Sequence, residues 1–169
     1  MVLDVVKYPE KILRNKSAKV KNIDSETADL ITNMAETMHS ALGIGLAAPQ
    51  VGINKRIIVV DITVGQDKTK LVKLFNPVVI ESHGSELGEE GCLSIPGEFA
   101  YIKRATEVYV KGIDVDGNEV TIEAKDLMAR VLQHEIDHLD GVLFIDRLPI
   151  IKRELLKKHI KKRIAKNEY

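Results

Sequence analysis

Residues 126–141 read DLMARVLQHEIDHLDG, and the rest of the fold can be inferred outward from this stretch. Leu127 and Val131 stand four positions apart, which is the spacing of apolar residues on one face of a helix. Gly141 closes the stretch, as glycine often ends helices because it accepts a left-handed backbone. We therefore predict a helix that is capped by Asp126 and packed among the other elements of the chain.

His134, Glu135 and His138 give this helix an HExxH pattern. A spacing of four puts both imidazoles on one helix face, where a single metal ion can contact both. The glutamate between them can hold a water proton without being a ligand. Two solvated histidines on a surface helix are the alternative interpretation, but histidines on an apolar core helix need partners, which favours a metal site. The other histidines are isolated among polar or helix-surface neighbours, and we expect no metal contact from His39, His83 or His159.

Cys92 is the only cysteine, so the chain cannot form an internal disulfide. It lies in the stretch 84–97, which is rich in glycine and glutamate and has few strand or helix signals, so we predict a loop. A lone cysteine is commonly a small buried hydrophobe, but in such a loop it is a candidate metal ligand or nucleophile. With His134 and His138 it would leave a fourth position for water, as catalytic metal sites do. Bound metal lowers the pKa of that water to about 7, and Glu135 would carry its proton to a leaving amine, which is amide hydrolysis.

The remaining elements follow from apolar periodicity and from turn residues. We expect a helix over 24–42 that ends at Gly43, strands over 56–61, 70–80, 107–115 and 119–123, and a last helix after Pro149. Pro77 lacks an N–H, so the second strand should be interrupted there, lying at an edge or bending. The last helix should bury an apolar stripe made of Ile150, Ile151, Leu155, Leu156, Ile160 and Ile164. The predicted class is α+β, with mostly antiparallel sheets packed around the central helix.

Composition describes an ordinary globular protein. A chain of 169 residues with 44% hydrophobic and 30% charged residues fits one domain over 1–169. Lys+Arg 25 and Asp+Glu 25 give a formal net charge of zero, which excludes a uniformly basic binder of DNA or other polyanions. No signal-peptide pattern or apolar run of ~20 residues is evident, so we expect a soluble cytoplasmic protein with no membrane contact.

Three separated segments resemble the signature motifs of one enzyme family. They read GIGLAAPQ at 43–50, EGCLS at 90–94 and QHEIDH at 133–138. In order, spacing and chain length they are similar to peptide deformylases, and the resemblance spans nearly the whole sequence. It implies removal of the N-formyl group from the initiator methionine of nascent chains, with release of formate, by a monomeric enzyme.

The resemblance also implies roles for individual residues. Metal ligands would be Cys92, His134 and His138, and the acid–base group would be Glu135. The side-chain amide of Gln50 and the backbone N–H of Leu93 would donate to the developing oxyanion, and Gly45 would offer backbone groups to the extended peptide. A methionine-sized apolar pocket near the metal could be walled by Ile44, Leu127 and Val131. Ligand chemistry alone suggests zinc, whereas the resemblance implies Fe²⁺, with Zn²⁺, Ni²⁺ or Co²⁺ as substitutes.

Two other hypotheses remain open at the level of sequence. An HExxH endopeptidase is one, although such enzymes usually take a third ligand from a His or Glu downstream. No downstream candidate stands out here, since His159 lies in the basic tail, whereas Cys92 lies upstream. A non-enzymatic, metal-stabilised binding module is the other, and it predicts that Glu135 is dispensable. Release of formate from a formylated peptide, against cleavage of an internal bond, separates these functions.

Charge is distributed unevenly along the chain. Residues 150–169 hold eight lysines and arginines against two glutamates, a net charge of +6, so the rest of the chain carries −6. A solvated helix face is the plain interpretation. Because the implied substrates emerge from ribosomes, the alternative is that this helix anchors the enzyme on ribosomal RNA, through contacts that weaken with salt. We expect a deletion after Arg153 to weaken that contact and to spare activity on short peptides.

Overall fold

The structure, a computed structural model, describes residues 1–169. Its helices are α1 (Ser25–Ser40), α2 (Asp126–Leu139) and α3 (Ile150–Ala165). Its strands are β1 (Gly45–Ala47), β2 (Ile57–Val60), β3 (Val72–His83), β4 (Glu86–Cys92), β5 (Ile95–Arg104), β6 (Glu107–Ile113) and β7 (Glu119–Lys125). Strands pair as a five-stranded sheet in the order β1-β2-β3-β6-β7 and as a separate hairpin, β4-β5. All named pairs are antiparallel, so the predicted α+β class is confirmed.

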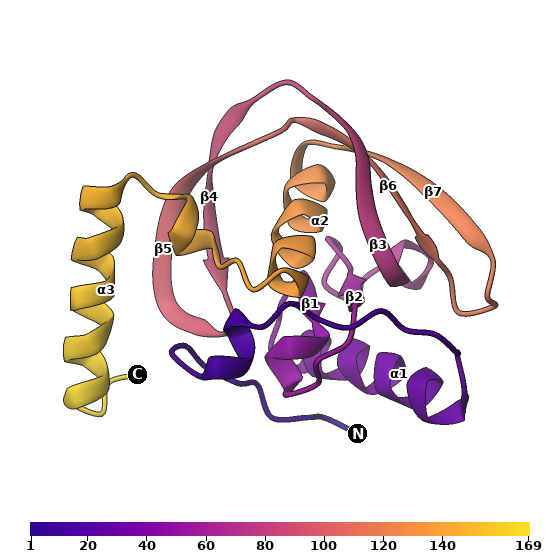
Figure 1. Cartoon of the computed structure of the whole chain (residues 1–169), viewed down its shortest axis with the longest axis horizontal. Helices are drawn as coiled ribbons and strands as arrows, with labels where there is room; N and C mark the ends of the chain where they lie inside the picture. Colours follow the sequence, from indigo (N-terminus) through magenta and orange to yellow (C-terminus); the bar gives the residue numbers. More distant parts are fainter.

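Helix α2 occupies the centre of the molecule, as predicted. In Figure 1 it lies between the hairpin on one side and strands β3, β6 and β7 on the other, while α3 stands outside the hairpin. Its apolar face buries Ala129, Leu132 and Ile136 in one cluster with residues of the five-stranded sheet, such as Val60 and Val110. Burial of that face, at about 25 cal/mol per Å², is what holds the helix inside. No helix has both the length and the hydropathy that a membrane crossing demands.

Helix α1 begins as predicted and ends differently. The Asp24 carboxylate accepts a hydrogen bond from the Thr27 N–H at 2.8 Å, which caps the first turn. At the other end Leu42, not Gly43, takes the left-handed conformation, with φ 56°. Gly43 instead donates its N–H to the Met38 carbonyl at 2.9 Å. A Cβ at Gly43 would be a tight fit, because it would lie 3.0 Å from the Leu93 side chain.

The loop predicted over 84–97 is wrong, because most of this stretch is paired strand. β4 and β5 pair from Glu86–Arg104 to Cys92–Ile95. Two glycines that look like loop residues are strand positions covered by a neighbour's side chain. A Cβ at Gly91 would lie 2.7 Å from the Phe99 ring, and one at Gly88 would lie 2.8 Å from the Arg130 guanidinium. These glycines therefore reflect close packing rather than a turn.

Three smaller expectations also change. Asp126 does not cap helix α2, because it is the first residue of the helix, with φ 53°. Lys125 takes the N-cap position and makes no side-chain capping hydrogen bond. Strand β3 continues through Pro77 and is not an edge strand, since it lies between β2 and β6. Its register with β6 shifts between Phe75 and Val78, which agrees with the alternative of an irregularity at the proline. The apolar stripe of α3 is mostly exposed. Only Ile160 is buried, because the helix touches the body of the fold along a narrow line.

Candidate metal centre and active site

Three side chains that are far apart in the sequence converge beside α2. Cys92 is the last residue of β4, and His134 and His138 project from successive turns of α2. The Cys92 Sγ lies 3.3 Å from the His138 Nε2, which lies 3.3 Å from the His134 Nε2. All three potential ligand atoms lie within 4.8 Å of one another, and both histidines are buried.

This donor set fits a divalent transition-metal ion. Two nitrogen ligands at 2.0–2.1 Å from one tetrahedral ion are about 3.3–3.4 Å apart, which matches the separation of the two imidazole nitrogens. Burial opposes protonation of His134, yet contacts with Cys92 and Glu90 outweigh it and raise its pKa well above the usual value. Burial and nearby His134 lower the pKa of His138 well below its usual value. The surroundings of His134 thus favour a positive charge, whereas those of His138 favour a neutral imidazole.

Glu90 is the residue that orients His134, and the sequence reasoning gave it no role. Its carboxylate accepts from the His134 Nδ1 at 2.9 Å and from Arg104 Nε and Nη2 at 2.9 Å each. Burial raises its pKa, but these hydrogen bonds outweigh burial and hold the pKa at about 2. A carboxylate on the far nitrogen fixes the ring and leaves Nε2 free to bind a metal. The sequence did contain a signal for this role, since Glu90 directly precedes Gly91-Cys92 in the second motif.

Glu135 lies beside the ligands in a very different environment. Its side chain is buried, and its Oε2 has no hydrogen-bond partner. Burial raises its pKa to about 7. Gly45 packs directly against it, since a Cβ there would overlap the carboxylate. Such a carboxyl group can both accept and release a proton near neutral pH.

Gln50 and Leu93 present hydrogen-bond donors on the thiol side of the cluster. The 3₁₀ turn Ala48–Val51 holds Gln50, whose Oε1 accepts from the Ala47 N–H at 2.9 Å. This bond fixes the amide orientation, so that Nε2 points to the Cys92 Sγ at 3.4 Å and to Ser94 at 3.2 Å. The N–H of Leu93, in the turn after Cys92, makes no hydrogen bond within the chain.

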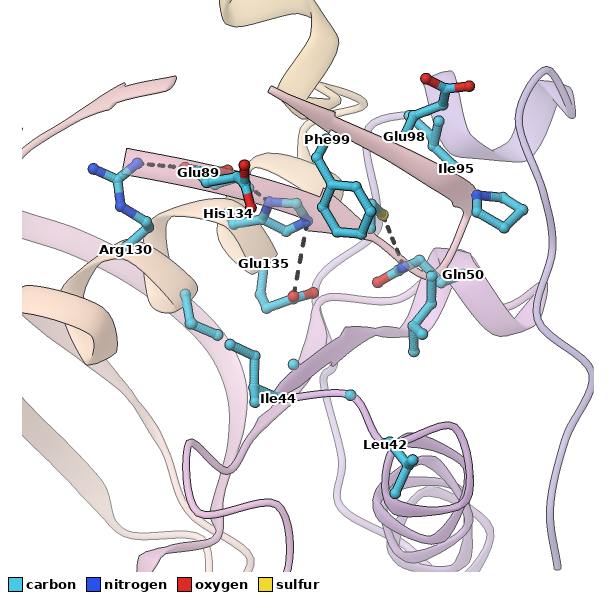
Figure 2. Close-up of a pocket in the computed structure, with 18 of the residues that line it drawn as sticks. Leu42, Ile44, Gln50, Glu89, Ile95, Glu98, Phe99, Arg130, His134 and Glu135 are labelled. Carbon is cyan, nitrogen blue, oxygen red and sulfur yellow. Dashed lines mark hydrogen bonds and ion pairs between the residues drawn. The ribbon is translucent and has the colours of Figure 1, made fainter. Parts of the chain in front are cut away.

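A cavity of about 540 Å³ opens onto these groups. Figure 2 shows Ile44, Gln50, His134 and Glu135 around it. Most residues named from the sequence line it, including Gly45, Cys92, Leu93, Leu127 and Val131, whereas His138 is almost fully covered. Several further lining residues were given no role from the sequence, among them Leu42, Phe99 and Arg130. Neither motif nor periodicity marks them, because they meet the cavity only through tertiary packing.

The other histidines lie outside the cluster, each beside a carboxylate. His39 contacts the buried Asp61 at 2.7 Å, His83 contacts Glu81 at 2.8 Å, and His159 contacts Glu98 at 3.2 Å. Each of these histidines therefore lies among polar neighbours, with a carboxylate within hydrogen-bond distance. None belongs to the group of potential metal ligands.

Comparison with known proteins agrees with this geometry. The model of the polypeptide deformylase family matches residues 2–154. The chain belongs to this family. A peptide deformylase of Thermodesulfovibrio yellowstonii is 50% identical over 160 residues, covering 95% of this chain and 97% of the relative. One of Halothermothrix orenii is 50% identical over 155 residues, covering 92% and 99%. The crystal structure of a Legionella pneumophila peptide deformylase has a TM-score of 0.92 at 38% identity, covering 99% and 98%.

Family membership fixes the class of chemistry. Deformylases are metal-dependent enzymes that remove the N-formyl group from nascent peptides, and this is the activity of the chain. The endopeptidase and binding-module hypotheses are thereby set aside. The shared fold explains why the three motifs meet, since it brings the turn with Gln50, the end of β4 and helix α2 around one cavity.

Proposed function

We propose that the deformylase reaction takes place in the cavity between β1, the β4-β5 turn and α2, with the residues identified above in defined roles. The observation that carries this proposal is the convergence of Cys92, His134 and His138 beside the Glu135 carboxyl, whose Oε2 has no hydrogen-bond partner. Cys92, His134 and His138 hold one divalent ion. We propose Fe²⁺ in the cell, with Zn²⁺, Ni²⁺ or Co²⁺ able to replace it, and metal analysis of anaerobically purified enzyme tests this.

The ion supplies Lewis-acid chemistry, which lowers the pKa of a water molecule and polarises a carbonyl. Glu135 takes the proton of the attacking water and delivers it to the methionine nitrogen as the bond to the formyl carbon breaks. Gln50 Nε2 and the free N–H of Leu93 donate to the oxygen that gains charge in the transition state. Gly45 aligns the peptide backbone, and Ile44, Leu127 and Val131 enclose the methionine side chain.

The sharpest test of these roles is the Glu135→Gln variant. It keeps the shape of the side chain and the three ligands but cannot carry a proton. We expect kcat for formate release from formyl-Met-Ala-Ser to fall by about 10²–10⁴-fold, with stoichiometric metal retained. Glu119→Gln, an exposed change on β7, is the matched control and should keep wild-type kcat. Near wild-type activity of Glu135→Gln would contradict the acid–base assignment.

We also propose that α3 contacts ribosomal RNA. Five lysines of this helix and its end are exposed, namely Lys152, Lys158, Lys161, Lys162 and Lys166. Arg163 is not part of that surface, because it donates to Glu98 at 2.7 Å and to the Pro96 carbonyl at 2.8 Å. We propose a cytoplasmic location, because an enzyme that acts on nascent chains works where the ribosomes are.

Substitution tests this contact better than truncation. Ile160 is fully buried, so a deletion after Arg153 would damage the fold as well as the charge. Combined Lys158→Ala, Lys161→Ala and Lys162→Ala should weaken co-sedimentation with ribosomes at low salt, lower its salt dependence, and leave formate release from short peptides unchanged. Lys16→Ala, Lys19→Ala and Lys21→Ala remove the same charge elsewhere and should have no effect. Equal co-sedimentation of both triple variants would rule out the α3 contact.

A further inference from the structure

Arg130 stands on α2, one turn before His134, and reaches across to the β4-β5 hairpin. Its Nη1 donates to the Glu90 Oε2 at 2.8 Å and to the Ile102 carbonyl of β5 at 2.7 Å. Its Nη2 donates to the Glu86 carbonyl of β4 at 2.9 Å. One side chain therefore binds both strands of the hairpin and the carboxylate between them. Figure 2 shows Arg130 at the edge of the cavity, with a dashed line from its guanidinium to a carboxylate.

The facing strand is shaped to receive this guanidinium. Gly88 lies under it, and a Cβ there would come within 2.8 Å of the Arg130 Cζ. Any other residue at position 88 would displace the guanidinium from the strand. Because arginine offers several donors in a planar fork, it can satisfy two carbonyls and a carboxylate at once, whereas a lysine ammonium is a point charge.

This contact matters because the metal ligands come from the two elements that it joins. Cys92 ends β4, and His134 and His138 belong to α2. The hairpin shares no backbone ladder with the five-stranded sheet and is joined to it only at its outer end, where β4 follows β3 and β5 precedes β6. Side-chain contacts therefore contribute to holding the rest of the hairpin against α2. Arg130 is also bound to Glu90, the carboxylate that orients His134. A shift of the hairpin would therefore change both the ligand spacing and the orientation of one ligand.

The same guanidinium forms part of a wall. Arg130, Leu127 and Glu89 line the active-site cavity, and they also line a second cavity of about 420 Å³ beside β4 and the start of α2. Leu127 is half exposed and Glu89 is exposed, so Arg130 is the member of this wall that hydrogen bonds hold in place. We expect the loss of this side chain to open the active-site cavity towards the second one.

We propose that Arg130 is a positioning residue that fixes the hairpin against α2, and thereby sets the spacing of the metal ligands and the closed side of the methionine pocket. Arg104 also binds Glu90, and it binds Asp137 of α2, but it is almost fully buried. Its loss would remove buried hydrogen bonds from both carboxylates, so a variant at Arg104 would disturb the interior as well as the hairpin. The pocket part of this inference rests on the proposed function, whereas the metal part does not.

Two readouts on the full-length, zinc-loaded enzyme test the role of Arg130. The first is the rate of zinc release to a chromophoric chelator, which we expect to rise about tenfold in Arg130→Met, as for other losses of support behind a ligand. The second is the ratio of kcat/KM for formyl-2-aminooctanoyl-Ala-Ser to that for formyl-norleucyl-Ala-Ser. This ratio should rise several-fold, because the longer side chain can enter the opened space.

Matched variants separate positioning from general destabilisation. Arg14→Met also removes an ion pair, with Asp146, but Arg14 touches neither hairpin strand, so both readouts should stay at wild-type values. Gly88→Ala keeps Arg130 while displacing its guanidinium, and it should move both readouts in the direction of Arg130→Met, which covers the case that Arg130→Met fails to fold. Arg130→Lys should fall between wild type and Arg130→Met.

Unchanged zinc release and an unchanged substrate ratio in folded Arg130→Met or Gly88→Ala would overturn the inference. Faster zinc release with an unchanged ratio would overturn the pocket part alone. Absence of formate release from formyl-norleucyl-Ala-Ser by the wild-type enzyme would instead count against the proposed function, and zinc release would still decide the metal part.

Discussion

At the scale of single residues, two buried glutamates beside the same histidine are set to opposite states by their hydrogen-bond partners. Glu90 receives donors from His134, Arg104 and Arg130, and its pKa lies at about 2. Glu135 has no donor on Oε2, and burial raises its pKa to about 7. Proximity to the site is thus not enough to assign a role. Glu90 is locked as an anion that supports a ligand, while Glu135 can exchange a proton.

Asp61 shows the same physics away from the site and gives a pH prediction. Burial opposes its ionisation, but hydrogen bonds from Thr63, His39 and Gly65 outweigh burial and lower its pKa from 3.8 to about 2. Its contribution to folding, about 2 kcal/mol, is therefore present above pH 3.8 and lost as pH falls towards 2. In urea unfolding, Asp61→Asn should be less stable than wild type by about that amount at pH 7, with a smaller difference at pH 3.

Asp116→Asn, in the exposed turn between β6 and β7, is the control and should track wild type at both values of pH. A stability difference between Asp61→Asn and wild type that stays constant from pH 7 to pH 3 would show that the Asp61 carboxylate charge is not what stabilises the fold.

At the scale of elements, the hairpin β4-β5 explains what the sequence could not predict. Strands are recognised when apolar residues alternate towards the core. Here the inward side chains include Glu90 and Arg104, whereas Phe99 and Tyr101 are about two-thirds exposed. The buried Glu90 is bound to His134, Arg104 and Arg130, so the inward face of the hairpin is partly polar and its pattern resembles a polar loop. Helix α2 keeps its apolar face towards the core, and periodicity predicted it correctly.

The end of α1 yields a stability prediction, because an exposed leucine occupies a position that suits glycine. Leu42 has φ 56° and is 79% exposed, so it carries backbone strain without compensating burial. We expect Leu42→Gly to stabilise the fold by about 0.5–1 kcal/mol, the strain relieved less the entropy that glycine gains in the unfolded chain. Leu42→Ala keeps the strain and should show no gain. Equal urea midpoints for the two variants would argue that the leucine is unstrained.

At the scale of the whole molecule, the site is a product of long-range assembly. Gln50, Cys92 and His134 come from three motifs, and each motif is recognisable in the sequence because its chemistry is local. The sequence does not reveal which other residues hold the three motifs together. Arg104 and Arg130 look like ordinary surface charges until the fold brings them to Glu90. Packing, rather than any pattern along the chain, determines those contacts.

Because the proposed ligands Cys92, His134 and His138 join β4 to α2, we expect metal binding to stabilise the entire fold. An ion that binds only the folded state adds about 4 kcal/mol at a thousandfold excess over its Kd, which for a chain of this size is on the order of 10 °C in Tm. Calorimetry of the enzyme before and after chelation should show this loss, and added zinc should reverse it. Cys92→Ala removes one ligand, so its Tm should respond little to zinc or chelator, and its metal content should be well below one ion per chain. A Cys92→Ala protein that kept stoichiometric metal and the full metal-dependent rise in Tm would refute the assignment of Cys92 as a ligand.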